Sequence, residues 1–426
     1  MNITPQGSVF KSPKRTVEYS AVQIGHSFIN AIAGFSSVIL LDAGLTNSEL
    51  GVVLTLANVL SAILQTTLAR TLDKRKSSSI SRYLITICLA LILASTLLLV
   101  PGLPPTLIAL LTLNTGVPTM IPLVSSLAML AVNTGFNVNF GLARGLGSLN
   151  FALATAFTGW IITRNGAKMI TWLIVFALVI MIIAIINFKA SISGTRRSNL
   201  FDPDQSGGIS EARLGEVYRK TVTSDQEEPS PGYNKRKFHF LILGWILILT
   251  GNSAMGTYLY QITTSLGGGA QNMGMARAIS AIAELPPMLG FVWLSMRFSS
   301  SSLLRLSSIG FALKSVLLMS VSNIYGLYLV ASLQFMGYGL FIPSSVYYVN
   351  ELLPRNAQVQ GQVQMNMTWT IGIILGTLSG GFIIDHFGMR TQLVASAILS
   401  ICGVLLVLPS VESLKNKSSH ICATKQ

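Results

Sequence analysis

The chain has 426 residues, of which 51% are hydrophobic and only 10% are charged, and its mean hydropathy is +0.61. Soluble domains carry about 25% charged residues, so this composition excludes a water-exposed globular protein and indicates a chain that lies mostly in lipid. The formal net charge is +14. The basic residues are scattered over short connections and form no single stripe, which favours membrane anchoring over nucleic-acid binding.

Twelve apolar runs follow a polar arm of sixteen residues that has no cleavable signal pattern. A membrane-spanning helix needs about 20 mostly apolar residues, and each run approaches that length. The sequence therefore predicts an all-α membrane protein with twelve spans, at residues 17–41, 49–69, 83–101, 105–132, 145–163, 168–188, 238–262, 274–296, 303–321, 324–348, 359–384 and 391–409.

Lysine and arginine are concentrated on one side of this arrangement. The arm, the second, sixth, eighth and tenth connections and the tail carry most of them, whereas the opposite side has few, namely Arg164, Lys168, Arg277 and Arg390. Cytoplasmic loops are enriched in these residues. We therefore expect both termini in the cytoplasm and the chain in a plasma membrane.

Residues 189–237 form the one long polar connection, and it divides the spans into six plus six. Its composition is that of a solvated linker. The predicted organisation is a cytoplasmic arm (1–16), an N-terminal six-helix bundle (17–188), a cytoplasmic linker (189–237), a C-terminal six-helix bundle (238–409) and a cytoplasmic tail (410–426).

A short internal repeat supports this division. The segment 158–166 ends the fifth span and the segment 380–388 ends the eleventh, and the two share glycines and an Ile-Ile pair in one register. A duplicated six-helix unit places such a match at equivalent positions of its halves, although a chance match in helices rich in glycine and isoleucine is the alternative.

The layout resembles the major facilitator superfamily. Residues 69–76, between the second and third spans, are similar to its loop signature, in which a glycine precedes an aspartate by four residues and basic residues follow; here Ala69 replaces the glycine and Asp73 is the aspartate. The segment from Gly141 through Arg144 to Gly147 resembles one in lactose and phenylpropionate permeases. The resemblance implies a transporter in which Asp73 and Arg144 are gating candidates; for Arg144, a membrane-surface anchor is the alternative.

Glu284 and Lys314 lie within apolar spans, where charged residues are rare and usually mark a substrate or proton path. Counted from the flanking basic residues, they lie about 20 Å and 14 Å deep on adjacent antiparallel spans, so they can pair. Pairing favours the ionised carboxylate, and burial without a partner favours the neutral acid. We predict that both take part in proton coupling, with a purely structural ion pair as the alternative. Pro286 and Pro287 predict a kink directly after Glu284.

Uncharged polar side chains form stripes at helical spacing along several spans. A polar face in lipid must look toward protein or water, so we predict a cavity wall, with hydrogen bonding between helices as the alternative. The substrate-binding candidates are Gln23, His26, Asn30, Asn58, Asn252, Gln334, Tyr338, Gln362 and Asn366.

These features predict a monomeric secondary transporter that moves a small sugar-like or organic solute by alternating access, with protons as the coupling ion. Efflux of sugars or drugs by proton antiport is the alternative. The chain has no P-loop for nucleotide hydrolysis, and its cysteines have neither disulfide nor metal-ligand spacing. We expect no cofactor, no metal, no enzyme activity and no nucleic-acid partner; the expected partners are the solute, protons and lipid.

Overall fold

The computed structural model describes residues 13–73, 79–133, 140–199 and 234–412, which are almost entirely helical. The first half of the chain forms seven helices and one short 3-10 turn, because its long apolar runs satisfy their backbone hydrogen bonds only within helices when they lie in lipid. In chain order these are α1 (Pro13–Ala33), α2 (Ser36–Asp42), α3 (Asn47–Asp73), α4 (Ser79–Thr96), η1 (Leu97–Leu99), α5 (Leu103–Asn133), α6 (Phe140–Asn165) and α7 (Met169–Asn199).

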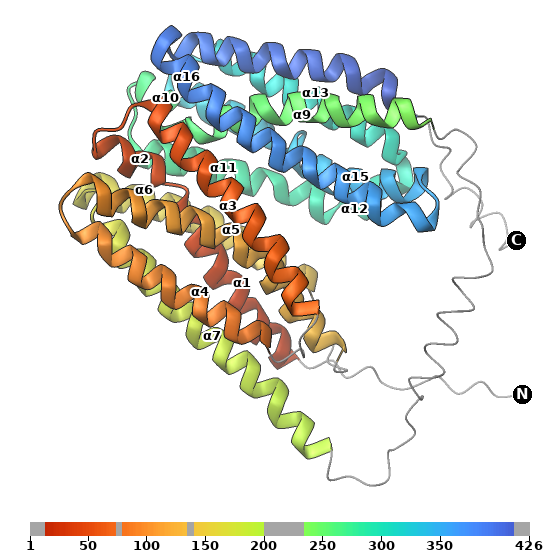
Figure 1. The fold of residues 1–426 in the computed structure, drawn as a ribbon. Helices are drawn as coiled ribbons and strands as arrows, with labels where there is room; N and C mark the ends of the chain where they lie inside the picture. Colours follow the sequence, from red (N-terminus) through yellow and green to blue (C-terminus); the bar gives the residue numbers. More distant parts are fainter. Residues whose placement is uncertain (1–12, 74–78, 134–139, 200–233, 413–426) are drawn as a thin grey trace, which may run out of the picture.

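The second half forms a similar group of helices (Figure 1). The side chain of Asn234 accepts hydrogen bonds from the first turn of α9 and so fixes where this half begins. The elements are α9 (Lys235–Thr257), α10 (Leu259–Ser265), α11 (Ala270–Leu289), α12 (Phe291–Arg297), α13 (Ser300–Met319), α14 (Ile324–Ser332), η3 (Leu333–Phe335), α15 (Tyr338–Leu352) and α16 (Arg355–Ser410).

Ten helices in the described part of the chain are long and apolar enough to cross a membrane. One of them runs over 51 residues within α16 and is broken at Gly388, whose φ of 83° is a conformation that favours glycine. At 1.5 Å per residue that segment is long enough to cross twice. Helix α11, with Arg277 and Glu284, is not among the ten. The count of twelve therefore stays a prediction.

Several predicted spans are interrupted in the structure. The first breaks after Gly34 into α1 and α2, the seventh breaks at Tyr258 into α9 and α10, and the eighth breaks at Gly290. The helix continues through Pro286 and Pro287, so the predicted kink lies a few residues later than expected. Helix α7 runs to Asn199, beyond the predicted end of the first bundle at 188. Most of the predicted linker, the arm and the tail fall outside the described residues.

Each half has an apolar core, and the core of the first half extends to Tyr258, Ala270 and Met273 of the second. Large apolar side chains also cover the outside of the molecule. In the first half the rings of Tyr19 and Phe188 lie 5.7 Å apart, and in the second the rings of Trp245 and Phe341 lie 4.2 Å apart. Leu93 and Leu405 are more than 60% exposed. An apolar outer surface is what a bundle embedded in lipid presents.

The repeated segments lie at matching places where the two halves meet. A β-carbon on Gly159 would overlap the carbonyl oxygen of Ala270 at the start of α11, and one on Gly381 would overlap that of Asn47 at the start of α3. Each repeat therefore packs one half against the beginning of a helix from the other half. This reciprocal contact agrees with the predicted duplication.

The two halves touch mainly at one end of the molecule. Helix α1 begins and α16 ends at the opposite end, which we call the terminal face; the end that contains α2, α10 and the break in α16 is the far face (Figure 1). At the far face, the backbone N–H of Gln271 donates to Thr163 Oγ1 at 3.1 Å, and the Tyr258 hydroxyl donates to the Asn47 carbonyl at 3.3 Å. The halves diverge toward the terminal face (Figure 1).

Candidate functional site

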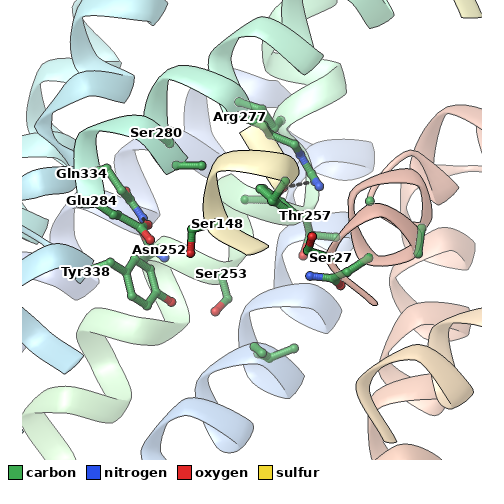
Figure 2. Close-up of a pocket in the computed structure, with 18 of the residues that line it drawn as sticks. Ser27, Ser148, Asn252, Ser253, Thr257, Arg277, Ser280, Glu284, Gln334 and Tyr338 are labelled. Atoms are coloured by element: carbon green, nitrogen blue, oxygen red, sulfur yellow. Dashed lines mark hydrogen bonds between the residues drawn. The ribbon is translucent and has the colours of Figure 1, made fainter. Parts of the chain in front are cut away.

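A cavity of about 730 Å³ lies between the two halves and is lined by both. Its volume is within the usual range of about 300–1,000 Å³ for small-molecule sites. Figure 2 shows polar side chains from α1, α6, α9 and α11 directed toward it. The lining contains ten of the thirteen candidates named from the sequence: Gln23, His26, Asn30, Asn58, Arg144, Asn252, Glu284, Lys314, Gln334 and Tyr338.

Glu284 and Lys314, which the sequence showed could pair, make no direct ion pair, because Gln334 lies between them. The ammonium of Lys314 donates to Oε1 of Gln334, and the amide nitrogen of Gln334 donates to the Glu284 carboxylate at 3.0 Å. Residue 334 belongs to η3, where α14 gives way to α15, so the break in this span turns the amide toward both charges. The amide oxygen accepts from the cation and the amide nitrogen donates to the anion, so one side chain connects both charges.

Replacing Gln334 with Leu should destabilise the protein, because it leaves a buried cation and a buried anion without their hydrogen bonds. Hydrogen bonds to charged groups contribute about 1.5–3 kcal/mol each, so we expect the loss of these two to cost about 3–6 kcal/mol. Thermal unfolding in detergent measures the change. Gln362→Leu is the matched control, since that amide donates only to Val346 O and Asn350 Oδ1; equal destabilisation by both variants would contradict the bridge.

An aromatic and amide wall adjoins this bridge. The ring of Trp369 packs edge-on against Tyr338 with centroids 4.7 Å apart. The buried hydroxyl of Tyr338 has no hydrogen-bond partner of good geometry among the described residues, although Asn252 lies beside it (Figure 2). Buried hydroxyls are normally paired, and Asn252 is the amide placed to pair with this one.

Several polar side chains that line the cavity from the first half also make hydrogen bonds within the protein. The amide of Gln23 donates to the Tyr19 hydroxyl at 2.9 Å, His26 Nε2 lies 3.4 Å from the Val117 carbonyl, and the amide of Asn58 donates to the Leu54 carbonyl at 2.8 Å. Asn30 is exposed to the cavity. For Gln23 and Asn58 the amide nitrogen bonds within the bundle, and the amide oxygen accepts no hydrogen bond from the described residues.

Three candidates lie elsewhere. Gln362 and Asn366 on α16 do not line the cavity, and Gln362 bonds to α15 instead. For Gln362 the alternative interpretation, hydrogen bonding between helices, therefore applies, whereas Asn366 is exposed. Asp73 is the last residue of α3, and its side chain lies outside the described part of the structure. Arg144 is exposed at the start of α6, toward the terminal face.

Arg277 is a lining residue that the distribution of basic residues placed on the opposite side of the membrane, at the start of the predicted span 274–296. Helix α11 begins at Ala270, so Arg277 lies two turns inside it, and its guanidinium donates to the Gly256 carbonyl at 3.3 Å. The signal was present in the sequence: Arg277 and Glu284 are seven residues apart, which places them on one face of a helix. Its position near the end of an apolar run concealed this.

A carboxylate of the second half is hydrogen-bonded to the first half at the far face. Asp385, near the break in α16, accepts hydrogen bonds from the backbone N–H of Asn47 at 3.2 Å, from the Asn47 amide at 2.7 Å and from the backbone N–H of Ser48 at 2.6 Å. These donors form the start of α3, where a negative charge is favourable. In the sequence, Asp385 stands out only as part of the repeated segment 380–388.

No group of three or more His, Cys, Asp or Glu side chains within the described ranges could hold a metal ion. Glu284 is the one carboxylate among the described lining residues, and Arg144, Arg277 and Lys314 are the cations.

The chain matches the model of a known family, described as the MFS_1 like family, over residues 25–394. It is 24% identical over 290 residues to the maltose permease of Geobacillus stearothermophilus, covering 68% of this chain and 67% of that protein. It is 24% identical over 303 residues to the uncharacterized transporter YwbF of Bacillus subtilis (strain 168), covering 70% of this chain and 69% of that protein.

Solved structures share the fold. The nucleoside transporter NupG has a TM-score of 0.67 at 14% identity, covering 93% of this chain and 98% of that chain. A bacterial homologue of the iron transporter ferroportin has a TM-score of 0.67 at 12% identity, covering 96% of this chain and 100% of that one. The expected all-α major facilitator fold is confirmed. The chain belongs to the MFS_1 like family and is a multi-pass membrane transporter of the major facilitator type, not an enzyme.

Proposed function

We propose that this protein is a secondary active transporter of a small organic solute, in which the cavity opens alternately to each side of the membrane and Glu284 carries the coupling proton. The observation that carries the proposal is the placement of Glu284. It is the one carboxylate among the described lining residues, and it shares Gln334 with Lys314.

Proton coupling requires a group whose protonation can change as its surroundings change. A charged Lys314 and the hydrogen bond from Gln334 stabilise the ionised Glu284 carboxylate, whereas burial opposes them. Tightening of the apolar walls around the bridge would favour the neutral acid. A bound solute that takes over the Gln334 amide would do the same. Either change links proton binding to the conformation of the cavity, which is the condition for coupling.

The proposed sidedness places the terminal face in the cytoplasm. Lysine and arginine are most frequent in the connections at that face, in accordance with the positive-inside rule. Contact between the halves at the far face then corresponds to a state in which the cavity is reached from the cytoplasm. The alternate state requires this contact to separate and the terminal ends of α6 and α11 to approach, so that Arg144 and Glu284 come closer.

Locking the far face should stop transport. Thr163 and Gln271 lie in contact across the two halves, with Gln271 N donating to Thr163 Oγ1. In a variant whose native cysteines are replaced by alanine, Thr163→Cys with Gln271→Cys should form a disulfide that lowers the transport rate at least tenfold, and reduction should restore it. The single-cysteine variants are the controls. A cross-linked protein that transports at the normal rate would contradict alternating access.

A solute screen followed by a gradient test examines the proposal as a whole. Purified protein is screened by thermal shift against sugars, nucleosides, short peptides and organic acids, and the solutes that stabilise it are tested in sealed proteoliposomes. We expect accumulation that needs a pH gradient and disappears with a protonophore. A binder that crosses no faster than in protein-free vesicles would argue against transport, and uptake that is indifferent to the gradient would argue against proton coupling.

The same vesicles decide between uptake and efflux. Symport accumulates solute on the alkaline side, whereas antiport accumulates it on the acidic side. Apolar lining residues such as Leu54, Phe151 and Ile373 would suit the wider and less polar ligands of an efflux carrier.

A further inference from the structure

We propose that the transported solute carries an oxyanion, a carboxylate or a phosphate, and that Arg277 binds it. This inference rests on the transport function proposed above and narrows its substrate class. Arg277 lies on α11 with its guanidinium at the cavity wall (Figure 2). A cation inside the membrane is costly unless it has a partner or a function. The contacts of Arg277 satisfy only some of its hydrogen-bond donors and do not neutralise its charge.

The guanidinium has five N–H donors, and one of them donates to the Gly256 carbonyl. No carboxylate of the described residues lies within ion-pair distance of Arg277. The side chain lines the cavity, and its other N–H groups donate no hydrogen bond of good geometry to the described residues. A planar fork of free donors is the arrangement that binds a carboxylate or phosphate through two parallel hydrogen bonds.

Two interrupted helices hold the guanidinium in place. Helix α1 ends beside Gly34, where a β-carbon would overlap Nη1 of Arg277, and α9 ends just after Gly256. These are the first and seventh spans, which occupy corresponding positions in the two halves. Interrupted helices at corresponding positions mark the binding region of many transporters. The C-terminal ends of both helices carry partial negative charge, which stabilises the cation while leaving its formal charge free for a ligand.

The charge balance of the cavity points to the same class of ligand. Lys314 and Glu284 are connected through Gln334 and offset each other. Arg277 and Arg144 remain without a carboxylate within ion-pair distance among the described residues. A cavity with apolar walls and an excess of two positive charges attracts anions and repels cations. Arg277 and Glu284 lie about 10 Å apart along α11, so an anion held at Arg277 would leave room for the rest of the solute beside Tyr338.

The local field can be measured without knowing the solute. In a variant lacking native cysteines, Asn30→Cys places a thiol at the cavity wall one turn from Gly34. We expect it to react faster with a negatively charged methanethiosulfonate than with a positively charged one, relative to the same two rates for a free thiol. Arg277→Gln should lower that ratio at least tenfold. Arg297→Gln is the matched control, since Arg297 stacks on Trp293 outside the cavity and should leave the ratio unchanged.

The ligand class is tested with matched solutes: glucose, glucuronate and glucose 6-phosphate; uridine and its monophosphate; and propanol, propionate and inorganic phosphate. We expect binding to be confined to anions and to weaken at least tenfold in Arg277→Gln. Arg277→Lys should keep the reagent ratio but bind more weakly, because an ammonium lacks the planar fork. The solute that binds with the highest affinity shows whether the site prefers a carboxylate or a phosphate.

Three results would overturn the anion site: a reagent ratio indifferent to Arg277→Gln, a neutral solute as the strongest ligand, or no binding by any of the anions. The transport proposal can fail separately. If anions bind through Arg277 but never cross the proteoliposome membrane, the site stands and transport does not. If a neutral solute is accumulated equally by the wild type and by Arg277→Gln, transport stands and the anion site does not.

Discussion

Glu284→Gln should abolish accumulation of solute while leaving exchange intact. The substituted amide side chain can still accept the hydrogen bond from the Gln334 amide, so the wall of the cavity keeps its shape, but it cannot take up or release a proton. For one proton per solute, a pH difference of one unit can drive about a tenfold accumulation, since 1.4 kcal/mol corresponds to a factor of ten. We expect this ratio to fall to about one in the variant.

Two vesicle assays measure this effect. Uptake driven by a pH gradient reports accumulation, and exchange of labelled for unlabelled solute at equal pH reports movement of the loaded carrier. Glu351→Gln is the matched control: Glu351 lies on α15 outside the cavity and accepts a hydrogen bond from Ser300. Undiminished accumulation in Glu284→Gln would assign the bridge a structural role only, and loss of both activities would indicate that Glu284 binds solute instead of carrying the proton.

Asp385→Ala should shift the protein toward the state in which the far face is open. The substitution removes three hydrogen bonds between the carboxylate and the start of α3, and these join the two halves. They are exposed to solvent, so we expect a loss of about 2–3 kcal/mol in total. That is a shift of about 30- to 150-fold in the ratio of the two states.

The shift is measured as a distance between spin labels on Ala43→Cys and Arg390→Cys, two exposed positions at the far face of opposite halves. We expect a longer distance to gain population in Asp385→Ala. Glu49→Ala is the matched control, because Glu49 accepts from Thr46 at the same helix start but within one half. Equal distance distributions in all three proteins would show that Asp385 does not hold the far face closed.

The features that depend on short stretches of the chain could be predicted from the sequence. Apolar runs of membrane length, the polar segment between the sixth and seventh runs and the isolated Glu284 and Lys314 all follow from composition over short windows. The repeat at 158–166 and 380–388 could also be recognised, because positions of close backbone contact require glycine and glycine is read directly from the sequence.

The contacts between helices were not readable in this way. Helical spacing shows that Gln362 and Asn366 share a face, as Gln23 and His26 do, but not which neighbour that face meets. Gln362 bonds to α15, whereas Gln23 and His26 line the cavity. Glu284 and Lys314 were expected to be close enough to pair, but depth along two helices does not show that Gln334 of η3 lies between them.

Hydropathy and periodicity are properties of each segment alone, and they were sufficient to show a membrane protein built of two related groups of helices with a few charged residues inside. Which of those residues meet depends on the packed fold. The rotation of each helix about its axis, the breaks after Gly34 and at Tyr258, and the contact between the halves bring Arg277 to the cavity wall and Asp385 to the start of α3. These are set by packing between segments far apart in the chain, which no local pattern records.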